Sequence, residues 1–322
     1  MTLTRVLLCA GLALQVAFAW GQAPYPSKPV RVIVPAGTGG PDSVARIVGA
    51  QMSTQMGQPF LVENHAGANG IVGADMVAKA PPDGYTVMVY SSGLVINGHI
   101  YKKLPYDTAK DFTPVTNLVD NGGLFVVVSP SVPARNLKEL IELAKRPDSK
   151  LSYSSPGVGN TLHIAGELFN AAAGTNIQHI PYKGGGPAAA AVVAGEVQVM
   201  VSSPAPIMAF AKSGKVRALA YTGAKRASAL PDVPTTAEAG LPSFAPDGGW
   251  FGLFAPASTR PEIVQRLYRE AKTAMADAPT LEKIRGLGVE PIGDTPAEFA
   301  KFYAAEIRKY GEWVKIAKIQ PE

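Results

Sequence analysis

Short apolar runs alternate with amphipathic segments along most of the chain. The runs at 30–35 (VRVIVP), 60–64 (FLVEN) and 85–90 (YTVMVY) are typical of buried β-strands. Between them, the segment 43–56 repeats its apolar residues at helical spacing, and 71–80 is also helix-like. Continuous apolar strands joined by helices are typical of a largely parallel sheet that is covered on both faces. The pattern therefore predicts an α/β fold.

The same alternation begins again at 124–129 (LFVVVS). It continues with strands that we expect at 150–155, 177–182, 197–202 and 216–222. Helices are expected at 136–145, after the loop that ends at 161, and from Pro187 onward. The last part of the chain differs, because after 249–256 (GWFGLFAP) only helices are expected. They are predicted at 261–276, 280–287 and 296–316.

We therefore predict two domains joined by two chain crossings. Helices without strands cannot form a third α/β layer, so the C-terminal helices should pack on the first sheet. This makes domain 1 discontinuous (24–124 plus 250–322) and domain 2 an insertion (125–249). Two lobes joined by two crossings form a hinge, and a cleft between such lobes can enclose a small molecule.

The first 19 residues have the composition of a secretory signal peptide. Arg5 precedes an apolar run at 6–18 that is too short for a membrane span, and 17–19 (AFA) offers the small residues that signal peptidase requires. We expect cleavage before Trp20 and export to the periplasm; an uncleaved anchor is the alternative. Cleavage removes Cys9, the single cysteine, so the mature protein must rely on its hydrophobic core and not on disulfides.

Charge and motif content exclude several classes of function. Without Arg5 the chain holds 29 Lys and Arg against 25 Asp and Glu, and these charges are scattered singly, without the basic stripe of a nucleic-acid-binding protein. The glycine-rich turns lack the Lys-Ser/Thr ending of a P-loop, and no G-x-S-x-G elbow or H-E-x-x-H motif occurs. The four histidines lack metal-ligand spacing. We expect no nucleic acid, no cofactor, no metal ion and no enzymatic activity.

Four loops place a Gly-rich or Asn-rich turn ahead of a helix. They lie at 35–43 (PAGTGGPDS), 64–70 (NHAGANG), 154–161 (SSPGVGNT) and 182–186 (YKGGG). In α/β sheets such turns lie at the carboxyl ends of strands, where ligands bind. The first turn of each helix exposes unpaired N–H groups and the positive end of the helix dipole, and glycine allows an anion to approach them.

Each loop taken singly has a simpler explanation. It can be a tight turn in which Asp42 or Ser43 caps one helix and Asn160 or Thr161 caps another. What favours a ligand is the recurrence of this design on both sides of the expected hinge. Backbone N–H groups that bind a carboxylate contribute roughly 1.5–3 kcal/mol each, so no arginine is required.

The chain resembles the Bug-type extracytoplasmic solute receptors of the tripartite tricarboxylate transporter family. The resemblance extends over nearly the whole mature chain and rests on the motifs 57–86 (GQPFLVENHAGANGIVGADMVAKAPPDGYT), 101–107 (YKKLPYD), 151–169 (LSYSSPGVGNTLHIAGELF), 179–188 (HIPYKGGGPA), 229–242 (ALPDVPTTAEAGLP) and 250–256 (WFGLFAP). It implies the two-domain periplasmic binding protein type II (Venus-flytrap) fold, with mixed, mostly parallel sheets flanked by helices. It also implies capture of a small carboxylate and delivery to the membrane permease subunits of such a transporter. We expect a monomer.

The resemblance places ligand contacts in both lobes. In the first domain they fall at Ala36, Gly37, Thr38, Gly39 and Gly40, at Ser91 and Ser92, and near Asn69. In the second domain they fall at Ser155, Gly157, Gly159, Asn160 and Thr161, with Lys183, Gly184, Gly185 and Ser203 nearby. His163 can reach the ligand or can only hydrogen-bond the neighbouring loop. Ser91 and Ser92 can instead face solvent at a strand end, and Lys183 can be a surface charge.

Two departures from the family pattern affect the expected site. In the family the Asp usually lies three residues after the Gly-Gly pair, whereas Asp42 lies two residues after Gly40 here, one residue closer. The family also often carries Asp-Ser where this chain has Ser202-Ser203. Loss of that carboxylate disfavours a cationic amine and favours a plain di- or tricarboxylate or an aromatic acid over an amino acid.

Two other functions were weighed against transport. A carboxylate sensor that feeds a signalling kinase would use the same binding chemistry. An exported hydrolase would use His163 with Ser154 or Ser155, but it lacks an orienting acid, because Glu167 is expected to face solvent.

Overall fold

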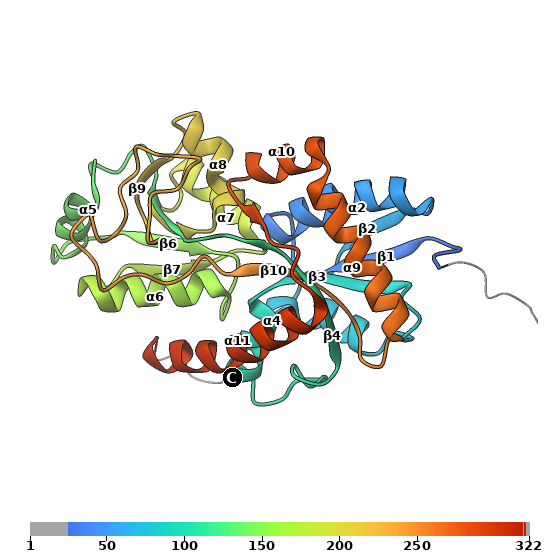
Figure 1. Cartoon of the computed structure of the whole chain (residues 1–322). Helices are drawn as coiled ribbons and strands as arrows, with labels where there is room; N and C mark the ends of the chain where they lie inside the picture. Colours follow the sequence, from blue (N-terminus) through green and yellow to red (C-terminus); the bar gives the residue numbers. More distant parts are fainter. Residues whose placement is uncertain (1–24, 318, 320–322) are drawn as a thin grey trace, which may run out of the picture.

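The computed structural model describes residues 25–317 and residue 319, so the expected signal peptide lies outside the described residues. Within this part, the chain forms two lobes, each built on one β-sheet (Figure 1). In Figure 1 the lobe at the right combines blue and cyan N-terminal elements with orange and red C-terminal ones, and the lobe at the left is mainly green to yellow. We call these the first and the second lobe.

Each sheet is described by its strands in spatial order. The sheet of the first lobe runs β11 (Glu290–Pro291), β4 (Phe112–Asp120), β10 (Trp250–Pro256), β3 (Thr86–Ser91), β1 (Val30–Val34) and β2 (Phe60–Asn64). The sheet of the second lobe runs β7 (Gln178–Pro181), β6 (Ser152–Ser155), β8 (Val199–Ser202), β5 (Phe125–Val128) and β9 (Arg217–Tyr221).

Both sheets are mixed. β1 pairs in parallel with β2 and β3, and β6 pairs in parallel with β7 and β8. Antiparallel pairing joins β10 to β3 and β4, β11 to β4, and β5 to β8 and β9. Antiparallel pairing is therefore as prominent as parallel pairing, which corrects the expectation of mostly parallel sheets. β11 also corrects the expectation that the C-terminal segment contains only helices.

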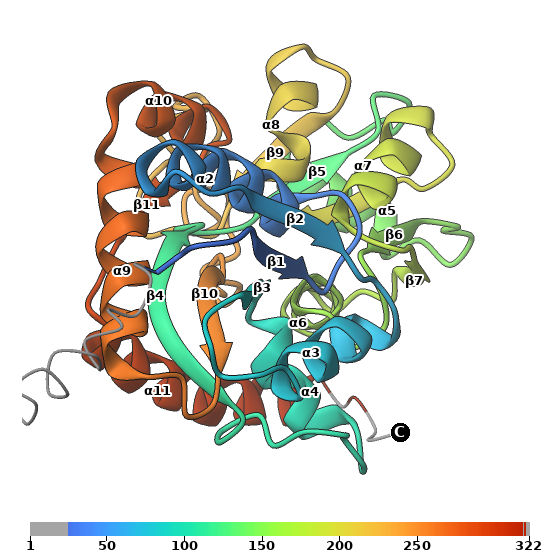
Figure 2. The ribbon, with the colours of Figure 1, turned by 90° about the vertical axis from the view of Figure 1, so that its right-hand side faces the viewer.

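Helices cover both faces of the first sheet (Figure 2). One face packs against α2 (Gly40–Met56), α9 (Pro261–Ala276) and α10 (Ala278–Gly286). The other face packs against α3 (Ile71–Ala78), α4 (Gly93–Ile100) and α11 (Pro296–Ile316). The C-terminal helices thus return to the first sheet, as the sequence predicts. A short 3-10 helix, η1 (Ala68–Gly70), precedes α3.

The second lobe has a hydrophobic core of its own. It packs α5 (Leu137–Ala144), α6 (Thr161–Ala173), α7 (Gly185–Ala194) and α8 (Pro204–Lys212) against its sheet. β5 is buried along its whole length, because helices or neighbouring strands cover it on all sides. Since the described residues contain no cysteine, each lobe is held together by apolar burial and hydrogen bonds.

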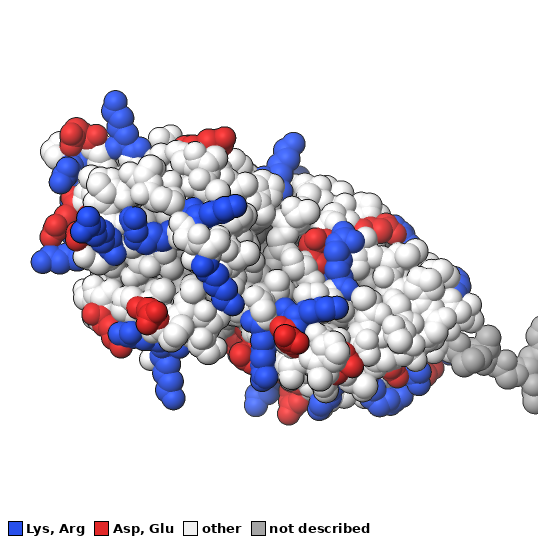
Figure 3. Space-filling view, turned by 90° about the horizontal axis from the view of Figure 1, so that it is seen from above, with Lys and Arg blue, Asp and Glu red and all other residues white. Residues whose placement is uncertain are grey.

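Charged side chains are dispersed over the surface. Figure 3 shows Lys and Arg intermixed with Asp and Glu over the face seen from above, rather than gathered in one patch. Many of them form exposed ion pairs, such as Arg31 with Glu63 and Arg226 with Glu238. No helix within residues 25–317 combines the length and the apolar character needed to cross a bilayer.

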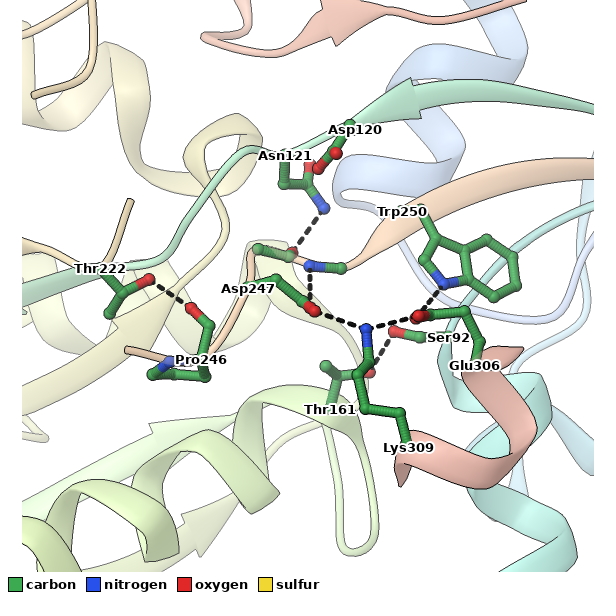
Figure 4. A network of polar contacts seen from close by, with 12 residues as sticks. Ser92, Asp120, Asn121, Thr161, Thr222, Pro246, Asp247, Trp250, Glu306 and Lys309 are labelled. Atoms are coloured by element: carbon green, nitrogen blue, oxygen red, sulfur yellow. Dashed lines mark hydrogen bonds and ion pairs between the residues drawn. The ribbon is translucent and has the colours of Figure 1, made fainter. Parts of the chain in front are cut away.

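The chain passes between the lobes from β4 to β5 and again between β9 and β10. The two crossings lie against each other at Asn121. Its backbone N–H donates to Gly249 O at 3.0 Å, and its Nδ2 donates to Gly248 O at 2.8 Å (Figure 4). We propose domain boundaries close to these crossings, with 24–124 plus 250–322 in one domain and 125–249 in the other.

A partly buried ion cluster joins α11 to the second crossing (Figure 4). Lys309 Nζ contacts the carboxylates of Asp247 and Glu306, and the indole N–H of Trp250 donates to Glu306 at 2.8 Å. Burial raises the pKa of Glu306 although Lys309 and Trp250 act in the opposite direction. Burial acts to lower the pKa of Lys309, but its hydrogen bonds to the two carboxylates raise it overall. The ammonium group is therefore what compensates the buried carboxylate.

Replacing Lys309 by Met should destabilise the protein. Glu306 is 4% exposed and would keep its charge without a cation. We expect the free energy of unfolding to fall by roughly 2–3 kcal/mol. This is less than for a fully buried pair, because Lys309 is itself partly exposed. Loss of the cation raises the pKa of Glu306 further above its unfolded value. Its ionisation then opposes folding as the pH rises, so the loss should be smaller at about pH 5 than at about pH 8.

Urea unfolding followed by tryptophan fluorescence measures this effect. Lys301→Met, at an exposed position on the same helix, is the matched control and should change stability little. Equal stability of the two variants at both pH values would contradict the assigned role of Lys309.

Candidate functional site

A cavity of about 430 Å³ lies between the two lobes. Loops of the first lobe supply 35–41, 66–70 and 90–92 to its wall, and loops of the second lobe supply 156–158, 160–162 and 182–185. The crossings supply Asn121 and 248–249. All four Gly-rich or Asn-rich loops singled out in the sequence therefore meet at one cavity, whose volume suits a small molecule.

Most residues predicted to contact a ligand lie in the wall of this cavity. They are Ala36, Gly37, Thr38, Gly39, Gly40, Asn69, Ser91, Ser92, Gly157, Asn160, Thr161, Lys183, Gly184, Gly185 and Ser203. Ser91 and Ser92 are buried, so they do not face solvent at the strand end.

Ser155, Gly159 and His163 do not line the cavity; they support the loop from behind. Ser155 is fully buried, and its Oγ donates to Gly157 O at 3.0 Å. The N–H of Gly159 donates to His163 Nδ1 at 3.0 Å. Of the two roles weighed for His163, the structure therefore shows the hydrogen bond to the neighbouring loop. A direct ligand contact, expected for these three residues, is corrected to a supporting role.

Five helices, α2, α3, α4, α7 and α8, begin at the cavity without a capping side chain, and three of them are considered first. Gly39 precedes α2, Gly184 precedes α7 and Ser203 precedes α8, and none of the three accepts a side-chain hydrogen bond from its helix. Uncapped first turns present unpaired N–H groups and the positive end of the helix dipole. Pro41 and Pro204 have no N–H and the N–H of Gly186 is bonded to Thr38 O, so the unpaired donors at the starts of α2 and α7 include the N–H groups of Gly40 and Gly185.

The predicted capping alternative holds for one helix only. At α6, Asn160 Oδ1 accepts a hydrogen bond from the N–H of Leu162 at 3.0 Å. At α2, Asp42 lies inside the helix and accepts from Arg46 Nε at 2.9 Å. Asp42, which lies nearer to the Gly-Gly pair than in the family, therefore forms an ion pair with Arg46 along the helix. The N-terminus of α2 is left without a side-chain cap.

The electrostatic character of the wall is positive. Lys183 is the one charged residue that lines the cavity in the described part of the chain, and it is exposed. No acidic residue lines it among the described residues, and none of their Asp, Glu, His or Cys side chains form a group that could hold a metal ion. An anion is the ligand that such a surface favours.

Hydrogen bonds cross between the lobes beside the cavity. The N–H of Gly186 donates to Thr38 O at 3.0 Å. The hydroxyls of Ser92 and Thr161 lie 2.8 Å apart. Asn69 Nδ2 donates to Gly159 O at 3.1 Å. The loops of the two lobes therefore hold the helix N-termini in register around the same space.

Sequence analysis missed the aromatic and hinge residues of the wall. They are Tyr90, Tyr101, Tyr182, Trp250 and Phe251, together with Asn121, Gly248 and Gly249. Most of the aromatic residues lie in or next to strands, where a large apolar side chain is typical of the core. Their position next to predicted contacts, as with Tyr90 before Ser91, is the signal that could have identified them.

Comparison with known proteins identifies the family. The model of the tripartite tricarboxylate transporter family receptor matches residues 44–319. The chain belongs to this family. The receptor is 33% identical to protein BugT of Bordetella pertussis over 323 residues, which cover 98% of both chains.

Solved structures similar to the receptor include two with a bound acid. An R. palustris protein with adipate is 32% identical, with a TM-score of 0.88, covering 92% of this chain and all of that one. MatC from Rhodopseudomonas palustris with bound malate is 32% identical, with a TM-score of 0.83, covering 90% of this chain and all of that one.

Family membership settles the fold and the class of protein. Relatives described as periplasmic transport or binding proteins share the two-domain α/β fold, so the predicted fold and the predicted family are confirmed. The family is one of solute-binding receptors and not of enzymes. The hydrolase alternative also fails in the geometry: Ser154 and Ser155 are fully buried, and Glu167 accepts from Tyr153 at 2.7 Å instead of facing solvent.

Gly37→Ala should force the two lobes apart. A Cβ at Gly37 would lie 2.5 Å from Lys183 O, a main-chain atom that cannot move aside alone. We expect a cost of roughly 1–3 kcal/mol for the contact between the lobes and a larger radius of gyration in solution scattering.

The matched control is Gly286→Ala, where an added Cβ meets no atom within 4 Å. It should leave the radius of gyration unchanged. A Gly37→Ala protein with the scattering profile of the wild type would show that the two loops are not in contact in solution.

Proposed function

We propose that the receptor captures a small organic carboxylate in the cavity between its lobes. The observation that carries this proposal is the set of three uncapped helix N-termini, α2, α7 and α8, around a wall without acidic side chains. Main-chain N–H groups bind a carboxylate through charge-assisted hydrogen bonds. Four or five such bonds, less the cost of immobilising the ligand, suffice for micromolar affinity.

The proposed ligand is a di- or tricarboxylate or an aromatic acid without an amine. The structural relatives with bound adipate and malate support a carboxylate. Ser202 is fully buried and donates to Ser203 O at 2.8 Å, so this position offers no carboxylate to a cationic amine. Trp250, Phe251 and Tyr90 supply apolar surface for the carbon skeleton or for a ring.

The proposed setting is the periplasm. The sequence of residues 1–19 supports export, and membership of a transporter receptor family supports delivery of the acid to membrane permease subunits. We propose that the receptor acts as a monomer. Capture of permease subunits from solubilised membranes would support transport, whereas capture of a kinase would support sensing.

A thermal-shift screen tests the ligand class. The panel contains malate, adipate, succinate, citrate and benzoate, with aspartate and succinamide as controls. Aspartate adds an amine to succinate, and succinamide removes its charge, so each control changes one chemical feature. An acid present at a hundredfold its dissociation constant should stabilise the protein by about 2.7 kcal/mol, and the two controls should not.

Two outcomes would contradict the proposal. Stabilisation by succinamide as strong as that by succinate would show that charge is not recognised. Stabilisation by aspartate alone would show that the site selects an amine.

A further inference from the structure

Three aromatic rings are stacked beneath the binding loop of the second lobe. His163 on α6 lies with its ring centroid 4.0 Å from that of His179 on β7, at an interplanar angle of 21°. Tyr153 on β6 also stacks on His179, with ring centroids 4.9 Å apart. The wall residues Gly157, Asn160 and Thr161 belong to the loop and helix start that this stack supports, so the stack lies behind the cavity and not within it.

The contact with Gly159 defines the protonation state of His163. The backbone N–H of Gly159 donates to His163 Nδ1 at 3.0 Å. An N–H group can only donate, so Nδ1 must carry a lone pair and the proton of the neutral ring must lie on Nε2. A doubly protonated His163 cannot accept this bond. Its charge state is therefore coupled directly to the backbone of the loop.

His179 supports the same loop from its other end. Its Nε2 lies 2.6 Å from Ser155 Oγ, and either atom can be the donor. Ser155 Oγ has a single proton, so when it donates to Gly157 O at 3.0 Å it accepts from His179 Nε2–H, and it also accepts from the N–H of Gly157 at 3.2 Å. The two imidazoles thus hold both ends of the turn at 155–159, whose middle lines the cavity.

The surroundings of the pair disfavour a positive charge. His163 is 9% exposed, and burial lowers its pKa, although the nearby carboxylate of Glu167 acts in the opposite direction. Glu167 is itself bonded to the hydroxyl of Tyr153. Burial and the neighbouring His163 lower the pKa of His179 to about 4. Because the rings are in contact, protonation of one also opposes protonation of the other.

We propose that neutral His163 and His179 are positioning residues for the binding loop, and that their protonation, at a pH well below the ordinary histidine range, loosens the loop and weakens ligand capture. The positioning role stands on the geometry alone, whereas the effect on capture rests on the proposed function. Neither residue touches the cavity, so the pair controls how well the N-terminus of α6 is held and not which acid is chosen.

The direction of the pH dependence follows from the lowered pKa values. The unfolded chain binds a proton at each histidine near pH 6.5, and the folded protein does so only at lower pH. Stability is therefore complete above about pH 6.5 and falls as the pH drops toward the folded value. For His179 alone the folding equilibrium constant should fall roughly 30-fold between about pH 7.5 and about pH 5.

The variants His163→Asn and His179→Gln test the proposal, singly and together. Asn places an amide atom where His163 Nδ1 lies, and Gln places one where His179 Nε2 lies, so both can keep their hydrogen bonds without titrating. His99→Gln is the matched control, because His99 Nε2 bonds only the carbonyl of Ile307 on α11, away from the loop.

Three measurements are made on the full mature chain. Two-dimensional ¹H–¹⁵N spectra of the wild-type imidazoles report the tautomer and titration of His163. Urea unfolding without ligand gives the folding equilibrium constant across the pH range. Isothermal titration calorimetry gives the affinities of wild type and variants for adipate and for malate. Because the proteins are compared at equal pH, the effect of protonation of the acid itself cancels.

We expect the Nε2–H tautomer at His163. The fall of the folding equilibrium constant with decreasing pH should be at least tenfold smaller in the double variant than in wild type and in His99→Gln. The affinity for the acid should fall with pH more steeply in wild type than in the double variant. A proton on Nδ1 at neutral pH, or equal pH profiles of stability in all proteins, would overturn the positioning role. If none of the five acids of the thermal-shift panel binds at any pH while the first two results hold, the proposed function fails and the positioning role stands.

Discussion

The structure depends on the close approach of two main chains where the lobes meet. The loop at 37–40 lies against the loop at 183–186, so that the N–H of Gly186 reaches Thr38 O and no side chain fits between them. Because the glycines have no Cβ, the wall of the cavity is made largely of backbone. Its donors are peptide N–H groups and its charge is that of helix dipoles. Under the proposed function such a wall recognises a carboxylate as a class, and it leaves little side-chain record of which acid is bound.

Much of the fold could be predicted from local pattern, because apolar runs and helical spacing reflect burial on one or both faces. Five elements were missed, η1, α4, β4, α8 and β11, and for two of them the physical reason is clear. α4 (Gly93–Ile100) is buried on almost all sides, so no polar face marks its period, and β4 contains Pro114, which interrupts a strand pattern. Strand direction was also not predictable, since a fully apolar run such as 250–256 looks the same in parallel and antiparallel pairing.

The candidate site divides in the same way. The glycine loops could be found because each is a local turn before a helix, and most of the residues predicted there line the cavity. Asn121 and Gly249 could not be found, because they meet only through the contact between two crossings far apart in sequence. The supporting role of Ser155 was equally hidden, since a motif shows that residues act together but not which of them faces the ligand.

Groups that can carry a charge are concentrated behind the wall rather than in it. Lys309 with its carboxylates stabilises the hinge side, and the stacked histidines support the second-lobe loop, yet none of these groups lines the cavity. An acidic side chain in the wall would cancel the helix dipoles, and an added cation would bind anions of any shape equally. Keeping the wall nearly free of charged side chains leaves selection among acids to the shape set by Tyr90, Trp250 and Phe251. If the receptor binds a carboxylate as proposed, changes at these aromatic residues should therefore alter the preferred acid without removing the affinity for carboxylates.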